Sequence, residues 1–192
     1  MLESRTVKTL TLLLAAMTVG AIALIVMETA PVRPPAEDLA AVAPPSDRLG
    51  QMVRSTEVPI QTARWRNIVI HAAPSPLAPW AQECHFAVGP VSPNVSVSDL
   101  WRQQHRGNHT NAPGRDYSRD SIGVCLIGDF SVDRPTPSQF EALVALLRSL
   151  QQTCRIPADH VYLHSDVDYR SSRPGPGLPA RELAERLIHA SR

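Results

Sequence analysis

The fold of this chain is decided by the stretch Trp65–Arg66–Asn67–Ile68–Val69–Ile70–His71. Its central three residues, Ile68 to Ile70, form an unbroken β-branched run, which is typical of a strand buried on both faces. His71 follows directly, so we expect its imidazole at the carboxyl edge of a sheet, where open α/β folds bind their ligands. A core histidine satisfied by a backbone carbonyl is the alternative for a single residue of this kind.

Length and composition bound the class of protein. The chain has 192 residues, 43% of them hydrophobic, which suits one folded domain of about 130 residues with extensions. The formal net charge is +1 and there is no basic stripe with interleaved aromatic residues, so we expect no nucleic-acid partner. The three cysteines lack C-x-x-C spacing, so neither a zinc ribbon nor a dense disulfide framework is indicated.

The N-terminal region carries a membrane signal. Residues 9–27 have no charged side chain and are long enough to cross a hydrocarbon core as a helix. Arg5 and Lys8 precede them, so the positive-inside rule predicts that residues 1–8 are cytoplasmic and that 9–27 form a signal-anchor. A cleaved signal peptide is the alternative, although the exit Met27–Pro31 lacks a small-x-small site. We expect a single-pass protein of a bacterial inner membrane with its folded part on the periplasmic, extracytoplasmic side.

Between the expected anchor and the folded part, residues 28–61 are expected to form a linker. The residues of this stretch show no sustained hydrophobic period, and prolines interrupt it repeatedly. These prolines are Pro31, Pro34, Pro35, Pro44 and Pro45. The folded domain is therefore expected to span residues 62–192.

The domain alternates strand and helix signals. Further strands are expected over Glu83–Val88, Ser121–Gly128 and Val161–His164. Thr136 is expected to cap a helix that begins at Pro137 and ends near Cys154, with Gln139 completing a capping box. A last helix is expected over Pro179–Ala190. Interleaved strands and helices indicate an α/β domain.

Six segments occur in an order and spacing that match a known family: Ile68–His71, Cys84–Phe86, Gly107–His109, Ser121–Phe130, His164–Val167 and Pro174–Pro176. Together they resemble the zinc-dependent N-acetylmuramoyl-L-alanine amidases, a group that includes phage lysozyme-type amidases and peptidoglycan recognition proteins. The resemblance covers about residues 62–190. It implies a central mixed β-sheet flanked by helices, with a groove that takes a muropeptide.

The resemblance also implies a metal site. In active members, zinc is held by the histidine after the first strand, by the histidine of the H-x-D motif, and by a Cys or Asp just before Pro-Gly. The first two positions are His71 and His164 in this chain. The metal polarises the lactyl amide between N-acetylmuramic acid and L-alanine and generates hydroxide at neutral pH. The resemblance places His109 in the groove as a substrate contact.

The chain departs from the family pattern at several positions. The residue before Pro-Gly is Arg173, whose guanidinium stays protonated and has no lone pair for a metal. The strand position that many active members fill with Glu is Cys125, and the usual Tyr before His-Phe is Cys84. The positions of the family's acid/base groups are therefore altered. Two imidazoles alone hold zinc weakly, so we expect zinc binding to be weak or absent.

Several roles stay open for the replaced groups. Cys84 is a candidate third zinc ligand, but also a candidate small core residue or half of a disulfide with Cys154. Asp168, four residues after His164, is a second candidate ligand or an exposed loop carboxylate. Arg173 is a candidate clamp for a stem-peptide carboxylate or a solvated loop arginine.

The sequence therefore predicts a membrane-anchored domain of the amidase family that is directed at peptidoglycan. We expect it to bind muropeptide with little or no hydrolysis. The alternatives are an active peptidoglycan amidase with a rearranged zinc site, and an interaction scaffold that engages neither wall nor metal.

Overall fold

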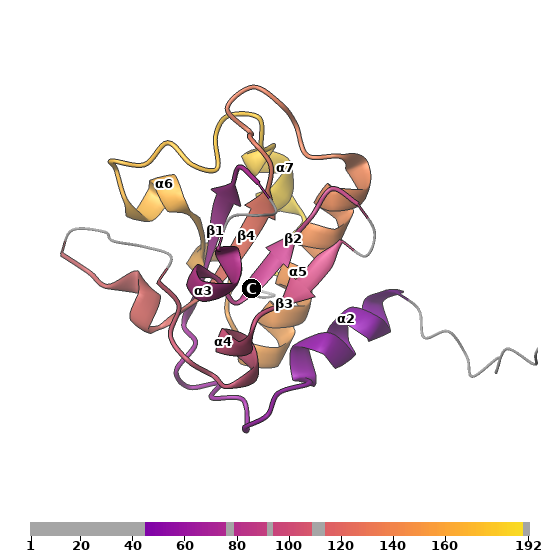
Figure 1. The fold of residues 1–192 in the computed structure, drawn as a ribbon, viewed down its shortest axis with the longest axis vertical. Helices are drawn as coiled ribbons and strands as arrows, with labels where there is room; N and C mark the ends of the chain where they lie inside the picture. The colour runs from indigo at the N-terminus through magenta and orange to yellow at the C-terminus, as the bar shows by residue number, and fades with distance from the viewer. Residues whose placement is uncertain (1–44, 76–78, 92–93, 109–113, 190–192) are drawn as a thin grey trace, which may run out of the picture. The chain divides into compact units, whose positions relative to one another are not determined.

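A five-stranded β-sheet forms the centre of the fold (Figure 1). In the order β3-β2-β4-β1-β5, the strands are β3 (Val95–Val97), β2 (Phe86–Val88), β4 (Ser121–Ile127), β1 (Asn67–Ala73) and β5 (Val161–Leu163). Neighbouring strands are parallel except β2 and β3, which are antiparallel. The expected mixed sheet flanked by helices is therefore confirmed.

The computed structural model describes residues 45–75, 79–91, 94–108 and 114–189. The expected membrane anchor over residues 9–27, the first half of the expected linker, and His109 lie outside the described residues. Among the helices that are described, none has both the length and the apolar character needed to cross a membrane.

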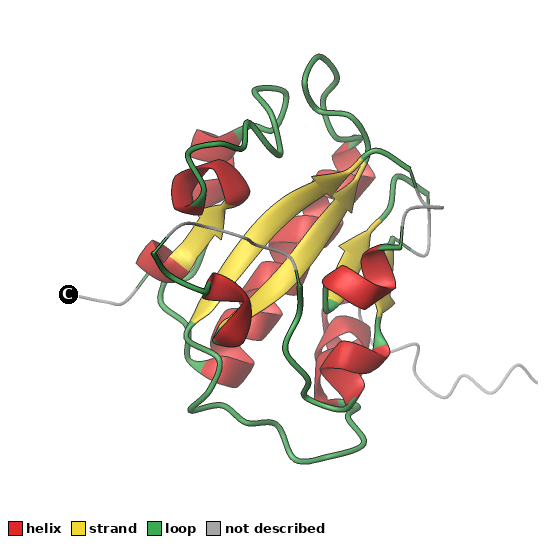
Figure 2. Cartoon of the chain, turned by 60° about the vertical axis from the view of Figure 1, so that its left-hand side comes forward, coloured by secondary structure: helices red, strands yellow, loops and turns green. Residues whose placement is uncertain are grey.

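The two faces of the sheet have different partners. On one face, Ile68, Ile70 and the alternate residues of β2 and β4 pack against the apolar side of α5 (Pro137–Cys154) in the main core. On the other face lies a smaller cluster of Ala73, Cys84, Ala87, Cys125 and Ile127. Figure 2 shows α5 along one face of the sheet and short helical segments across the other. His71 belongs to the second face, because side chains alternate along a strand.

Helix α5 begins as expected but uses one residue differently. Thr136 caps it, accepting a hydrogen bond at Oγ1 from the Gln139 backbone N–H at 3.2 Å. The Gln139 side chain does not complete a capping box. It donates instead to the carbonyl oxygens of Val88 at 3.0 Å and Ile127 at 2.9 Å. The start of the helix is thereby joined to the carboxyl ends of β2 and β4.

The compact unit that holds the sheet spans Ala43–Arg192 and so begins ahead of the expected boundary at residue 62. Helix α2 (Pro45–Arg54) occupies part of the expected linker, and its Val53 is fully buried in the main core. The Trp101 indole N–H donates to the Val53 carbonyl oxygen at 2.9 Å. The helix begins at Pro45, and proline is tolerated in the first turn, where its missing N–H is not needed.

Other elements are shorter than expected. The expected second strand begins only at Phe86, because Glu83 ends helix α3 (Trp80–Glu83), and α7 (Ala180–Glu185) is only part of the expected last helix. Strand β3 was not expected from the sequence. The remaining elements are α4 (Asp99–Arg102), α6 (His164–Val167) and 3-10 turns over Tyr117–Arg119 and Ala158–His160.

Candidate functional site

His71 and His164 lie side by side on the second face of the sheet. Strands β1 and β5 are parallel neighbours in which Ile70 pairs with Leu163, so the two histidines that follow these residues are brought together. Their ring centroids are 4.5 Å apart, with the planes tilted by 56°. The convergence of two imidazoles expected from the family resemblance is present.

The surroundings of His164 favour a neutral ring. Burial lowers its pKa below the ordinary value, the positive charge of Arg173 lowers it further, and the carboxylate of Asp168 opposes both effects. Its Nδ1 lies 3.3 Å from the Ser171 hydroxyl oxygen. Its Nε2 is buried and has no hydrogen-bond partner among the described residues. A neutral imidazole with a buried, unused nitrogen beside a second imidazole is suited to donating a lone pair to a metal.

Arg173 stands beside this pair where the family resemblance places a third ligand. Arg173, Ser172, Asp168 and His164 all border the same open hollow of about 490 Å³. The backbone of Arg173 is held on both sides, because its carbonyl accepts from Ser165 N–H at 2.9 Å and its N–H donates to the Ser171 hydroxyl at 3.2 Å. The site therefore presents a permanent cation next to His164 rather than a third donor.

Asp168 is committed to a different partner. Its two carboxylate oxygens accept from Nε and Nη2 of Arg170, each at 2.9 Å. These hydrogen bonds from Arg170 are the main reason that the pKa of Asp168 falls to about 2. The pairing with Arg170 competes with a role for Asp168 as the missing zinc ligand. The other alternative, an exposed loop carboxylate, is wrong, because Asp168 is buried.

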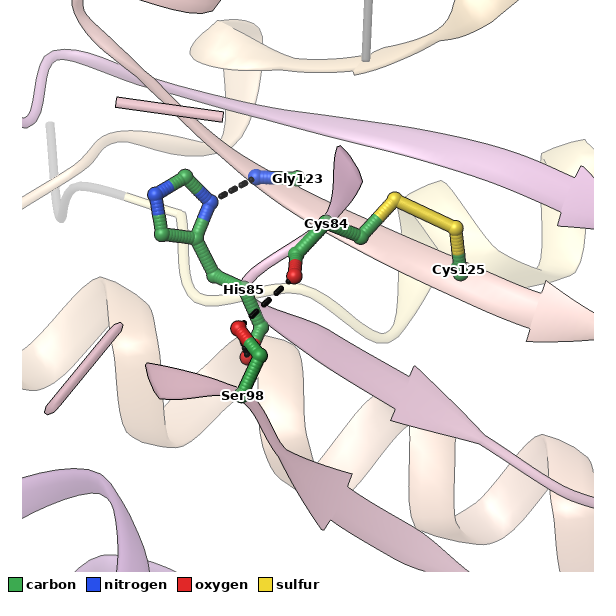
Figure 3. Close-up of a disulfide and its surroundings, with 5 residues drawn as sticks. All are labelled: Cys84, His85, Ser98, Gly123 and Cys125. Carbon is green, nitrogen blue, oxygen red and sulfur yellow. Dashed lines mark hydrogen bonds between the residues drawn. A yellow bond between two sulfur atoms is a disulfide. The ribbon is translucent and has the colours of Figure 1, made fainter. Parts of the chain in front are cut away.

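Cys84 and Cys125 are joined in a disulfide (Figure 3). Two of the three roles left open for Cys84 are therefore wrong, because its sulfur is neither available as a zinc ligand nor bonded to Cys154. Cys84 is buried in the small apolar cluster, as the third role expected. Cys154 is a free, buried thiol whose pKa burial raises to about 12. Cys125 is the register partner of His71, so the disulfide lies on the same face of the sheet as the histidine pair. The two altered acid/base positions are thus covalently linked.

The donor set can be compared with what zinc requires. The nitrogen atoms of His71 and His164 fit two positions of a zinc site, but catalytic zinc ordinarily has three protein ligands. Within the described part of the chain, no group of three or more His, Cys, Asp or Glu side chains is arranged to hold a metal. The described residues therefore do not fit a complete catalytic zinc site.

His85, which follows Cys84, has a structural role. It is fully buried, and its Nδ1 accepts from the Gly123 backbone N–H at 2.9 Å (Figure 3). Its Nε2 lies 2.9 Å from the His105 carbonyl oxygen, so the neutral ring bridges β4 and the chain after α4. Burial lowers its pKa to about 4. His85 belongs to a segment that carries the family resemblance. Its hydrogen bonds stabilise the fold, and it is not part of the site.

A second hollow, of about 180 Å³, adjoins the first and contains residues not identified from the sequence. Asp129 and Ser131, from the loop after β4, line it together with Ser172 and Arg173. The sequence contained a signal for Asp129, because this residue belongs to the S-I-G-x-x-x-x-G-D-F motif. Its nearness to Arg173 was not visible, since the two residues are far apart along the chain.

Glycines hold the two loops of this hollow together. Gly177 N–H donates to the Phe130 carbonyl at 2.8 Å, and a Cβ atom at Gly177 would collide with the backbone of Asp133. Gly175 has a φ of +110°, and a Cβ atom there would collide with the Phe130 backbone. The P-G-P-G segment can therefore lie directly against the loop after β4, which brings Arg173 and Asp129 to one hollow.

Comparisons with known proteins agree with this arrangement. Residues 58–176 match the family model described as N-acetylmuramoyl-L-alanine amidase. Among solved structures, the endolysin amidase LysCS from Clostridium intestinale URNW is 21% identical, with a TM-score of 0.54, over 69% of this chain and 90% of that chain. A search of curated protein sequences finds no match.

Two other similar structures contain peptidoglycan fragments. AmpDh3 from Pseudomonas aeruginosa, solved with an anhydromuramic pentapeptide, is 25% identical, with a TM-score of 0.52, over 66% of this chain and 61% of that chain. Peptidoglycan recognition protein LE, solved with tracheal cytotoxin, is 19% identical, with a TM-score of 0.52, over 66% of this chain and 84% of that chain. The second likeness concerns the fold alone.

Proposed function

The chain belongs to the N-acetylmuramoyl-L-alanine amidase family, and on that premise we propose that it binds muropeptides of peptidoglycan with little or no hydrolysis. The observation that carries the proposal is the presence of Arg173 beside His164, where the family resemblance places the third zinc ligand. A guanidinium repels a metal cation and cannot donate a lone pair to it. Zinc is accordingly expected to bind weakly or not at all.

The disulfide supports the same proposal. Hydrolysis of an amide requires groups that can transfer protons to and from the reacting atoms. Cys84 and Cys125 occupy the positions of the family's acid/base groups, and a disulfide neither donates nor accepts a proton at neutral pH. Loss of metal affinity and loss of proton transfer would both reduce hydrolysis, and each would do so independently of the other.

Retention of a polar groove supports binding. His164, Arg173 and two serines line the larger hollow, and Arg173 can clamp a stem-peptide carboxylate through two parallel N–H donors. Proteins of similar fold have been solved with an anhydromuramic pentapeptide and with tracheal cytotoxin. Peptidoglycan is therefore the proposed partner.

An active peptidoglycan amidase with a rearranged zinc site is the second candidate. The observation that favours it is the close, tilted pair of His71 and His164, with a buried Nε2 atom on each ring. Such a pair needs one more donor to hold zinc firmly. The two candidates differ in zinc stoichiometry and in hydrolysis.

Metal analysis and a peptidoglycan assay separate these candidates. For the purified full chain we expect clearly less than one zinc per chain, no release of stem peptide from sacculi, and sedimentation of the chain with sacculi. The variant Arg173→Asp should bind zinc more tightly, because it replaces the cation by a donor, and Arg134→Asp is the matched control on an exposed loop.

Two outcomes would contradict the proposal. One zinc per wild-type chain, lost in His164→Ala and accompanied by release of stem peptide, would establish the active amidase instead. If the chain stays in the supernatant when sacculi are sedimented, the interaction scaffold is the candidate function that remains.

We also propose that residues 9–27 anchor the chain in the inner membrane with the folded unit on the periplasmic side. The uncharged segment after Arg5 and Lys8 supports this, and so does the Cys84–Cys125 disulfide, since disulfides persist mainly in oxidising compartments. Membrane fractionation followed by protease treatment of spheroplasts tests it. Resistance of the folded unit to protease in intact spheroplasts, with digestion after lysis, would refute this orientation.

A further inference from the structure

An open hollow of about 660 Å³ lies at the edge of the sheet where β1 and β4 begin. These strands are parallel and start in register, since Asn67 pairs with Ser121, so the residues that precede the two strands meet at one edge. The residues that border the hollow come from these preceding segments: Gln61, Ala63, Arg64, Arg66, Arg119 and Asp120. His71 lies about 13 Å further along β1 than Asn67, so the hollow is separate from the histidine pair.

Arg64 is held in position by the protein itself. Its Nη1 donates to the Gln104 carbonyl oxygen at 2.6 Å, and its Nε donates to the Arg119 carbonyl oxygen at 3.4 Å. The guanidinium carbon lies 4.6 Å from the centre of the Trp65 ring, which is a cation–π contact. Among the described residues its Nη2 has no acceptor. The guanidinium is therefore fixed in place while N–H donors remain for a ligand.

Arg66 and Arg119 add two further guanidinium groups at this hollow. Both residues are exposed, and neither forms an ion pair within the part of the chain that the structure describes. Their backbones are held, because Arg66 N–H donates to the Asp120 carbonyl at 2.9 Å and Arg119 N–H donates to the Asp116 carbonyl at 3.2 Å. The two side chains therefore start from fixed points at the edge of the hollow.

Asp120 is the only carboxylate among the described residues that line the hollow, and its charge is offset. Its Oδ2 accepts from Arg115 Nη2 at 3.2 Å, and its Oδ1 accepts from Asn67 Nδ2 at 3.3 Å. Arg64, Arg66 and Arg119 are thus left with an excess of positive charge. An anion that lies between guanidinium groups relieves their mutual repulsion.

We propose that this hollow binds a phosphate group, with Arg64, Arg66 and Arg119 donating to its oxygen atoms. The planar guanidinium matches phosphate through two parallel N–H donors. A tetrahedral phosphate has enough oxygen atoms to contact three guanidinium groups at once, whereas a carboxylate has two. A metal cation would be repelled by the same charges.

The phosphate can belong to a larger molecule, because the hollow is wider than a phosphate ion. Free phosphate is one source, and the phosphodiester headgroup of an anionic phospholipid is another. Since the hollow and the histidine pair lie at opposite ends of β1, a bound headgroup would turn the histidine pair away from the membrane surface. The inference does not depend on peptidoglycan binding.

Nuclear magnetic resonance titration of the purified full chain at constant ionic strength tests the proposal. The probes are inorganic phosphate, the phosphodiester glycerophosphoglycerol, which is a phospholipid headgroup without acyl chains, and acetate. We expect the Arg64 Nε–H signal to shift to saturation with inorganic phosphate, with the phosphodiester, or with both. Acetate should bind at least about tenfold more weakly, because it leaves one guanidinium without a charged partner.

Two double variants with the same change in net charge separate the hollow from general attraction of anions. Arg66→Gln/Arg119→Gln should weaken phosphate binding at least about tenfold, while Arg64 and its backbone partners are retained. Arg134→Gln/Arg148→Gln removes two exposed arginines that do not line this hollow, and it should bind within about twofold of the wild-type chain. The dispersion of each spectrum shows whether the variant is folded.

The probes also identify the source of the phosphate. Saturation by glycerophosphoglycerol indicates a lipid headgroup, saturation by inorganic phosphate alone indicates a free phosphate, and both results support the site. The inference is overturned if neither probe saturates, if acetate binds as tightly as phosphate, or if the two double variants bind phosphate equally. Sedimentation with sacculi tests the proposed function separately, so the two can fail independently.

Discussion

His71, His164 and His85 show at the residue scale how the surroundings of an imidazole determine its role. The first two lie at the ends of neighbouring parallel strands, with ring centroids 4.5 Å apart. His85 also borders a strand, but a backbone N–H and a backbone carbonyl occupy its two nitrogens. A histidine whose nitrogens are both used by the backbone serves the fold, and a pair whose Nε2 atoms are buried next to one another's rings can serve a ligand.

The buried state of His85 predicts a loss of stability in acid. Its pKa is about 4 in the folded chain and 6.5 ordinarily, so between these values the unfolded chain binds a proton that the folded chain does not. The free energy of unfolding should be unaffected above pH 6.5 and should fall by about 3 kcal/mol as the pH drops from 6.5 to 4. Urea unfolding at a series of pH values measures the decrease.

Nuclear magnetic resonance assigns this effect to the residue. The ring of His85 should remain neutral at pH 5 in the folded chain. If His85 titrates near pH 6.5 while the fold is intact, the prediction fails. A free energy of unfolding that does not fall between pH 6.5 and 4 would also contradict the prediction.

At the scale of elements, the disulfide links two parts of the second face of the sheet. Cys125 lies in the middle of β4, and Cys84 follows α3 at the start of the chain segment that leads into β2. Together with Ala73, Ala87 and Ile127 they form an apolar cluster beneath Trp80. The cluster is small compared with the core on the α5 side, so a covalent link contributes a large part of its stability.

The double variant Cys84→Ala/Cys125→Ala should lower the free energy of unfolding by roughly 2 to 4 kcal/mol. The two cysteines are separated by 41 residues, and a cross-link over such a loop restricts the unfolded chain substantially. Denaturant unfolding with and without a reducing agent measures the effect. Reduction should destabilise the wild-type chain and leave the double variant unchanged.

Cys154→Ala provides the control for this experiment. Cys154 is a free thiol at the end of α5, so its replacement should leave the sensitivity to reduction intact. A wild-type chain whose stability does not respond to reduction under denaturing conditions would contradict the stabilising role of the disulfide.

At the scale of the whole molecule, the folded unit is longer than the family-like segment. Helix α2 contributes Val53 to the main core, with Leu49 and Met52 packed against it. The buried indole of Trp101 depends on the Val53 carbonyl for its hydrogen bond. Residues 45–54 therefore belong to the domain and do not act as a flexible tether.

Removal of α2 should destabilise the domain. A chain that begins at Ser55 should unfold with a free energy lower by at least about 2 kcal/mol than a chain that begins at Ala43, because burial of Val53 and half-burial of its neighbours are lost. Denaturant unfolding of the two chains measures the difference. Equal stability would mean that the domain begins after α2, as the proline-rich sequence suggests.

Local signals in the sequence determined the elements with their own internal pattern. The β-branched run Ile68–Ile70 specified a strand buried on both faces, and Thr136 followed by Pro137 specified the start of α5. The resemblance then indicated the mixed sheet and the meeting of His71 with His164. These features depend on contacts between residues that are close in sequence or on motifs of fixed spacing.

Only the tertiary structure decided the pairing of Cys84 with Cys125, the inclusion of α2 in the core, and the approach of Asp129 to Arg173. Each of these depends on which segments pack together in space, and one short motif carries no information about its distant neighbour. The two cysteines meet because Cys125 of β4 and Cys84, which lies just before β2, belong to one buried cluster, and the shared hollow follows from glycines that allow two backbones to touch. Elements with a strong internal pattern were therefore readable in the sequence, whereas the electrostatic character of the site required the packed fold.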